Sequence, residues 1–212
     1  MLETNPLSLG TRDVERFLGG FHDIDGDHQS AFAGRLKHLT RGGFPPGITG
    51  GPGVPAWYDA DRLFQMVTVT ALWQHGAMPA RAISLVLEAW PRLKQDVLHI
   101  WMAIDASERW GKPVEGYLSP AFWRVPVEAL RHMARKDRPY SPDKEDTIET
   151  LTSEQAHAAL DSRDYGLRGS AFIKADQLIR DAVTHLGDTV LPRPGDVALF
   201  MNSLIPPPRI EV

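Results

Sequence analysis

The 212-residue sequence predicts a mainly helical fold in two parts, on the basis of three observations. Apolar residues recur at helical spacing through most of the chain. Hydrophobic residues make up 42% of the sequence, which is enough to build a real core. Residues 41–58 hold six glycines and four prolines and separate two helix-like runs. We therefore expect one structural part over residues 1–95 and a second, helical part over residues 96–212.

Helical spacing predicts four helices in the first part, over residues 11–18, about 30–40, from Asp59 to Gly76, and 79–90. Thr11 is the expected cap of the first helix, and Gly19-Gly20 are expected to end it. Asp27 or Ser30 is the expected cap of the second helix. A proline in its first turn and a proline beyond its end bound the fourth helix.

Four more helices are predicted in the second part, over residues 92–110, 126–136, 152–160 and 170–186. Thr152 and Gln155 have the spacing of a capping box, in which each side chain bonds the backbone of the other residue. Charged and turn-forming residues between these helices indicate exposed connections. The sequence contains no internal repeat.

The composition narrows the chemistry that we expect. Cysteine is absent, which excludes disulfides, thiolate metal sites and a cysteine nucleophile. The chain opens without a basic and apolar leader, and no apolar run reaches about 18 residues. We therefore expect a cytoplasmic protein with no membrane partner, no metal and no cofactor.

The acidic turn DIDGDH, residues 23–28, resembles the opening of a calcium-binding loop. The pattern then fails, because His28 stands where glycine is needed and Gly34 where a closing glutamate is needed. His22 and His28 flank the acids without the spacing of a transition-metal site. A solvated turn between two helices is the better interpretation. Motifs for nucleophilic catalysis or a phosphate-binding loop are also missing from the sequence.

A basic segment follows the acidic turn. Residues 28–58 contain Arg35, Lys37 and Arg41 and no Asp or Glu. On a helix, Arg35, His38 and Arg41 lie roughly on one side. The apolar side chains face elsewhere: Phe32, Leu36 and Leu39. Such a helix suits DNA, because Arg and Lys neutralise phosphates and Arg can form two hydrogen bonds to guanine. An ordinary solvated helix face is the alternative.

The order of these segments resembles the winged helix-turn-helix of the MerR (mercury-resistance regulator) type, over about residues 8–90. In that family an arginine-containing helix leads through glycine into prolines, as in RLKHLTRGGFPPG. A Tyr-acidic stretch then starts the third helix, as in WYDADRL at residues 57–63. The segment ALWQHGAMPARAISLVLE at residues 71–88 resembles the two helices that follow.

The resemblance implies sequence-specific DNA binding in transcription regulation, with no enzymatic activity. The second helix would be the recognition helix, and residues 41–58 would be the wing, a hairpin close to phosphates. The residues expected at the DNA are Arg12 and Arg16 of the first helix, Ser30, Arg35, Lys37, His38 and Arg41 of the recognition helix, Thr49 of the wing, and Arg62 at the start of the third helix.

The expected partners are double-stranded DNA and a second copy of the chain, with the transcription machinery or another regulator as a further partner. Val97, Trp101 and Ile104 are the candidate dimer contact, with packing inside the chain as the alternative. Two other functions stay open. Tryptophan-rich helices can serve a protein-interaction module that has lost DNA binding, and residues 96–212 can hold an enzyme of unrecognised type. The tryptophans in question are Trp90, Trp101, Trp110 and Trp123.

Overall fold

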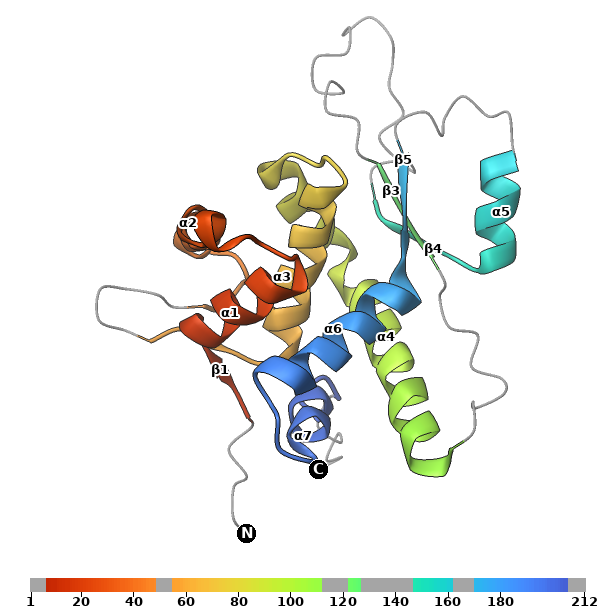
Figure 1. The fold of residues 1–212 in the computed structure, drawn as a ribbon. Helices are drawn as coiled ribbons and strands as arrows, with labels where there is room; N and C mark the ends of the chain where they lie inside the picture. Colours follow the sequence, from red (N-terminus) through yellow and green to blue (C-terminus); the bar gives the residue numbers. More distant parts are fainter. Residues whose placement is uncertain (1–6, 49–54, 112–121, 127–146, 162–169, 206–212) are drawn as a thin grey trace, which may run out of the picture. The chain divides into compact units, whose positions relative to one another are not determined.

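The computed structural model describes residues 7–48, 55–111, 122–126, 147–161 and 170–205 (Figure 1). The mainly helical prediction is confirmed for these residues, which also contain two small sheets. The elements are β1 (Leu9–Gly10), α1 (Thr11–Phe21), the short 3-10 helix η1 (Gly26–His28), α2 (Gln29–Arg41), β2 (Trp57–Tyr58), α3 (Ala60–Gln74), α4 (Pro79–Trp110), β3 (Phe122–Pro126), β4 (Glu149–Leu151), α5 (Ser153–Asp161), β5 (Ser170–Lys174), α6 (Ala175–Thr189) and α7 (Asp196–Asn202).

Contacts divide the chain into two compact units. Met1–Val67 and Asp181–Val212 form the first, called here the terminal unit, and Thr68–Arg180 form the second, the central unit. The predicted boundary at residue 95 lies inside helix α4. By contacts, the C-terminal end of the chain thus belongs with the N-terminal helices.

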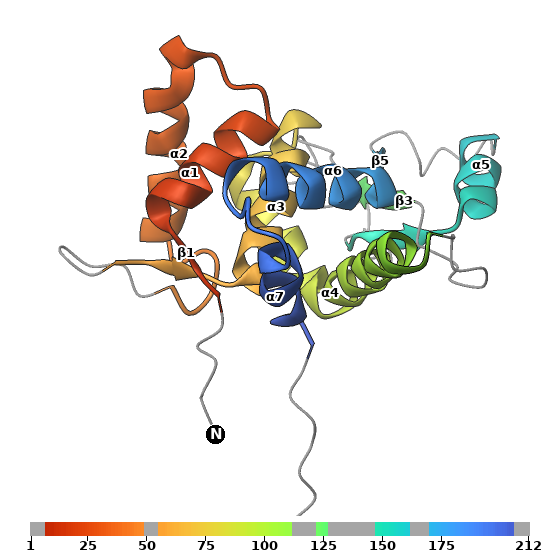
Figure 2. The ribbon, with the colours of Figure 1, turned by 60° about the horizontal axis from the view of Figure 1, so that its bottom comes forward.

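In the terminal unit, α1 lies between α2 and the C-terminal part of α6, as both views show (Figures 1 and 2). Strands β1 and β2 pair antiparallel, with Leu9 opposite Tyr58. The expected hairpin of the wing is therefore not seen in the described residues, because β2 pairs with the strand before α1 and residues 41–48 contain no strand.

Helix α1 continues through the two glycines that were expected to end it, so that prediction was wrong. A Cβ at Gly19 would lie 2.8 Å from Oε1 of Gln29, and one at Gly20 would lie 2.8 Å from Nε2 of His185. Both distances are closer than side chains pack. At Gly20 a side chain would have to displace the ring of His185, whereas at Gly19 the flexible end of Gln29 can give way. The cost of a glycine within a helix is only about 1 kcal/mol.

The predicted caps of the first two helices were also wrong. Thr11 is the first residue of α1, and the Gly10 N–H before it donates to Oδ2 of Asp13 at 3.4 Å. Helix α2 follows directly on η1 and has no side-chain cap. Asp25 instead accepts a hydrogen bond from the Asp27 N–H within the acidic turn.

Helix α3 is confirmed. Every residue from Leu63 to Leu72 is buried, around the whole circumference of the helix. Residues 66–70, MVTVT, alternate between apolar and polar side chains as strands do, but here both kinds are buried within a helix.

The prediction of two separate helices over residues 79–90 and 92–110 was wrong, because a single helix α4 of 32 residues runs through Pro91. Pro91 is exposed, and buried apolar residues recur before and after it at helical spacing. Their packing outweighs the roughly 3 kcal/mol that a proline costs inside a helix. The helix ends at Gly111, which has a left-handed backbone with φ of 62°.

In the central unit, β3 is the middle strand of a sheet with order β4-β3-β5, and both pairs are antiparallel. The prediction of a helix over residues 170–186 was therefore wrong in its first turn, which is strand β5 paired with β3. Helix α5 and its capping box are confirmed, since Thr152 and Gln155 exchange hydrogen bonds of 2.9 and 3.2 Å. Of the helix predicted at 126–136, residues 127–136 lie outside the described residues.

Asp96 of α4 connects that helix to the sheet. Its Oδ2 accepts hydrogen bonds from Trp123 Nε1 at 3.0 Å and from Thr150 Oγ1 at 2.7 Å. The Asp96 side chain is buried and both donors satisfy one oxygen, which fixes α4 against β3 and β4.

Among the described residues, no helix is both long and apolar enough to cross a membrane.

Candidate nucleic-acid interface

Helix α2 has one buried and one exposed side, as predicted. Its buried side chains are Phe32, Leu36 and Leu39. At about 100° per residue, the opposite direction falls among five exposed residues. These residues are Ser30, Gly34, Lys37, His38 and Arg41. Arg35 is also exposed and lies on the flank of the helix, between the buried side and these five residues; we call the five residues together with Arg35 the outward side of α2.

Most of the cations on the outward side are not used by the protein itself. Within the described part of the chain, Arg35, His38 and Arg41 form no ion pair and no side-chain hydrogen bond. Arg12 of α1 is exposed and equally without such a partner among these residues. The charges of the three arginines therefore remain available to an outside anion.

Two other predicted cations do have partners. Nη2 of Arg16 lies 3.0 Å from Oδ1 of Asp13, one turn earlier on α1. Both side chains are exposed, so this pair is weak and easily exchanged for a phosphate. Nζ of Lys37 lies 3.8 Å from Oε1 of Glu15 on α1. The long side chain of Lys37 thus reaches from the outward side of α2 to α1.

The start of α2 has the opposite charge. Asp23, Asp25 and Asp27 are exposed just before it, and Ser30 lies in its first turn. Carboxylates at this end repel phosphates, whereas the last two turns of α2 carry the cations. Charge therefore divides the helix along its length, with Ser30 at the acidic end.

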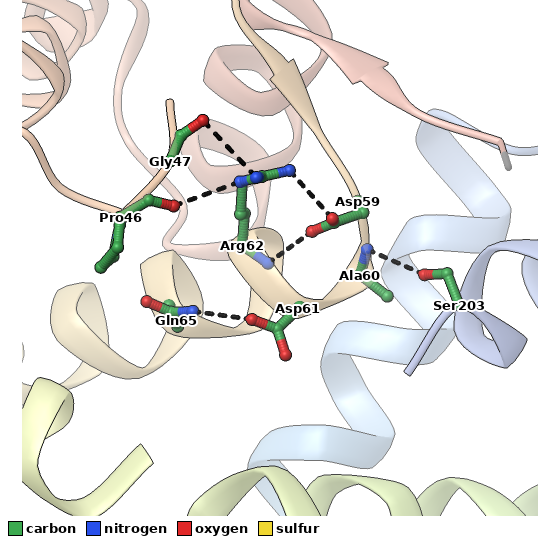
Figure 3. Close-up of polar contacts among 8 residues, drawn as sticks. All are labelled: Pro46, Gly47, Asp59, Ala60, Asp61, Arg62, Gln65 and Ser203. Atoms are coloured by element: carbon green, nitrogen blue, oxygen red, sulfur yellow. Dashed lines mark hydrogen bonds and ion pairs between the residues drawn. The ribbon is translucent and has the colours of Figure 1, made fainter. Parts of the chain in front are cut away.

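The predicted phosphate contact Arg62 is engaged within the fold (Figure 3). Its Nη1 lies 2.9 Å from Oδ2 of Asp59, and its Nε and Nη2 donate to the carbonyls of Pro46 and Gly47 at 3.3 and 3.5 Å. Pro46 and Gly47 precede residues 49–54, and Asp59 follows them. One side chain thus bonds to residues that precede and follow residues 49–54 in the sequence.

Gly47 is required by this arrangement. It has a left-handed backbone with φ of 77°, and a Cβ there would lie 2.9 Å from Nη2 of Arg62. At the start of α3, the Ala60 N–H donates to Oγ of Ser203 at 3.4 Å (Figure 3). This hydrogen bond joins the residue after α7 to the first residue of α3. The predicted wing contact Thr49 lies outside the described residues.

Tyr58 of β2 is buried next to α1 and α2. It is 1% exposed and lines a cavity of about 10 Å³ together with Glu15 and Lys37. Burial, and to a lesser extent the negative charge of Glu15, raise the pKa of Tyr58 to about 12. Tyr58 is therefore a neutral anchor of β2 at every physiological pH.

The predicted dimer contact is not free. Val97, Trp101 and Ile104 are 0%, 4% and 5% exposed within their own chain, so the alternative of internal packing holds. Among the tryptophans considered for partner binding, Trp110 is 70% exposed, and the other three are buried.

Sequence reasoning missed Glu15 and Asp59 as charged partners. The spacing of Asp59 and Arg62, three residues apart at a helix start, is a signal that could have identified their pairing. Glu15 and Lys37 lie on different helices, and the sequence carries no comparable signal for that pair.

Comparisons of the chain with protein-family models, with curated proteins and with solved structures each found no match.

Proposed function

We propose that the protein binds duplex DNA through the outward side of α2 and regulates transcription by sequence-specific binding. The observation that carries this proposal is the set of exposed basic side chains on α2 that have no partner within the described residues. Arg35, His38 and Arg41 belong to this set, and the other side of the same helix is anchored by buried apolar side chains. A helix that presents arginines without a partner suits the regularly spaced phosphate groups of duplex DNA.

The charge around α2 favours DNA binding, although the net charge of the whole chain does not. The whole chain has a formal charge of −4, yet no Asp or Glu occurs from residue 28 to residue 58. A local basic surface attracts DNA even on an acidic protein, because fields within about 10 Å dominate at physiological salt. The acidic turn before α2 would orient the complex, with phosphates at the Arg35–Arg41 end.

The MerR-type winged helix-turn-helix belongs to this proposal. The sequence resemblance and the order α1, turn, α2, glycine- and proline-rich stretch, α3 support it. Arg62 would then act as a structural support of the wing. We further propose a homodimer, since one such unit reads few base pairs and specific binders commonly pair on related half-sites.

A second function, a protein-interaction module, is favoured by the exposed Trp57 and Trp110. They are 57% and 70% exposed, and large exposed aromatic side chains are enriched at protein interfaces.

The test is a fluorescence-anisotropy titration of the full chain with labelled genomic duplexes at several salt concentrations. If Arg12, Arg35 and Arg41 each neutralise a phosphate, the slope of log K against log salt is about −3 per chain. The double variant Arg35→Gln/Arg41→Gln is expected to lose most of this binding. Its matched control, Arg92→Gln/Arg193→Gln, removes two exposed arginines elsewhere and should bind like wild type. Absent binding, or binding that salt does not weaken, would favour the interaction module.

A further inference from the structure

Glu15 and Lys37 form a charged pair across the seam between α1 and α2. The distance from Nζ of Lys37 to Oε1 of Glu15 is 3.8 Å, which is an ion pair but longer than a hydrogen bond. Oε1 of Glu15 is buried and has no hydrogen-bond partner. In the described part of the chain, Lys37 is the cation that forms an ion pair with this oxygen.

The two members of the pair differ in freedom. The Lys37 side chain is 57% exposed, so its long stem can turn away into solvent. The Glu15 side chain is 23% exposed and lines the small cavity beside Tyr58. Lys37 can therefore leave for an outside anion, whereas Glu15 cannot follow it.

We propose that Glu15 restrains the affinity of the protein for DNA by competing with phosphate for Lys37. This inference rests on the proposed function. When Lys37 moves to a phosphate, the half-buried carboxylate of Glu15 loses its counter-charge, and the complex bears that cost.

The cost is the same for every DNA sequence, since it arises inside the protein. It weakens binding to non-specific DNA, where phosphate contacts supply nearly all the affinity. Sites that offer good base contacts would still be bound. Glu15 in this sense sets the overall affinity for DNA and leaves the ratio of specific to non-specific binding unchanged, because specificity is a difference of affinities.

The test compares Glu15→Gln with Glu154→Gln in the full chain, by anisotropy with a duplex of random sequence. Both variants remove one negative charge, and Glu154 is exposed on α5. Glu15→Gln is expected to tighten binding by about two- to ten-fold, and Glu154→Gln to leave it unchanged. Circular dichroism establishes that both variants are folded.

A double-mutant cycle with Lys37→Ala shows whether the effect passes through Lys37. Lys37→Ala should cost more affinity in the Glu15→Gln background than in the wild type. Equal binding of the two glutamine variants would overturn the inference while leaving DNA binding in place. A gain from Glu15→Gln that persists fully with Lys37→Ala would also overturn it, because Glu15 would then act by direct repulsion of phosphate. If the wild type binds no DNA, the proposed function fails, and this inference fails with it.

Discussion

The helix pair α1–α2 has an inward side that packs within the fold and an outward side that is exposed. On the inward side, Phe17 is fully buried and its ring contacts Phe21 and His185, at centroid distances of 5.8 and 5.4 Å. On the outward side, Arg35 and Arg41 have no partner in the described residues. The fold explains the residues of the first side, whereas the proposed contact with DNA would explain those of the second side. Changes on the inward side should therefore alter stability, and changes on the outward side should alter binding.

The largest effect is expected on the inward side. Phe17→Ala removes a fully buried ring between α1 and α6 and should lower the free energy of unfolding by about 3–5 kcal/mol. Denaturant unfolding of the full chain measures this loss. Phe21→Ala is the matched control with a smaller expected loss, since Phe21 is only partly buried. Equal and small losses in both variants would mean that α6 does not support α1.

On the outward side, Arg35→Ala and Arg41→Ala should each weaken DNA binding and leave the melting temperature within a few degrees. Arg35→Ala should cost about 1–3 kcal/mol and relax the preference at one base pair. Arg41→Ala, near the helix end, should weaken all sequences alike and lower the salt slope by about one unit. Binding selections with each variant distinguish the two patterns. Wild-type binding by both variants would identify this side as an ordinary solvated surface.

Tyr58 of β2 lines a small cavity together with residues of α1 and α2. The raised pKa of its phenol predicts that stability depends on pH. Its phenol ionises near pH 12 in the folded chain and near 10.0 when unfolded. Between these values the folded state binds one more proton than the unfolded state, so stability falls as pH rises. The loss should be on the order of 2 kcal/mol over this range. Unfolding free energies below and above pH 10 measure it in the wild type and in Tyr58→Phe, which should lack this component. An identical pH dependence in both proteins would contradict the assigned burial.

The smallest effect concerns Gly34, on the outward side of α2. A Cβ there would meet no described atom within 4 Å, so the fold does not require glycine. Gly34→Ala should raise the free energy of unfolding by about 0.5–1 kcal/mol. If this side of the helix lies against DNA, the added methyl should also weaken binding. Gly26→Ala on the acidic turn is the control for binding, as Gly26 also has open space around it. A Gly34→Ala variant with unchanged affinity would place the contact elsewhere.

The sequence correctly predicted those features of the fold that depend on the spacing of residues close together in the chain. The two sides of α2, the helical conformation of α3, and the exchange of hydrogen bonds between Thr152 and Gln155 follow from spacing alone. The errors lie where a distant partner decides. Gly20 lies within α1 at a point where His185 packs against it, and residues 170–174 form a strand because β3 pairs with them.

The candidate site was predicted to a similar extent. The sequence located the cations of α2, because their spacing and the absence of nearby acids are visible in it. It could not separate free cations from engaged ones. Arg62 and Arg41 look equally suited to phosphate in the sequence, but Arg62 binds Asp59 and two carbonyls. The partners of a long side chain depend on tertiary structure, which spacing does not report.

The most direct test of the account is a nuclear magnetic resonance titration of the isotope-labelled full chain with duplex DNA. The account predicts that signals of Arg12 and of residues 34–41 shift on addition of DNA and return as salt is raised. Signals of the acidic turn at residues 23–27 and of α5 should stay in place. DNA binding that leaves residues 34–41 unshifted, or a spectrum that DNA does not change at all, would contradict the claim that the outward side of α2 is the DNA interface.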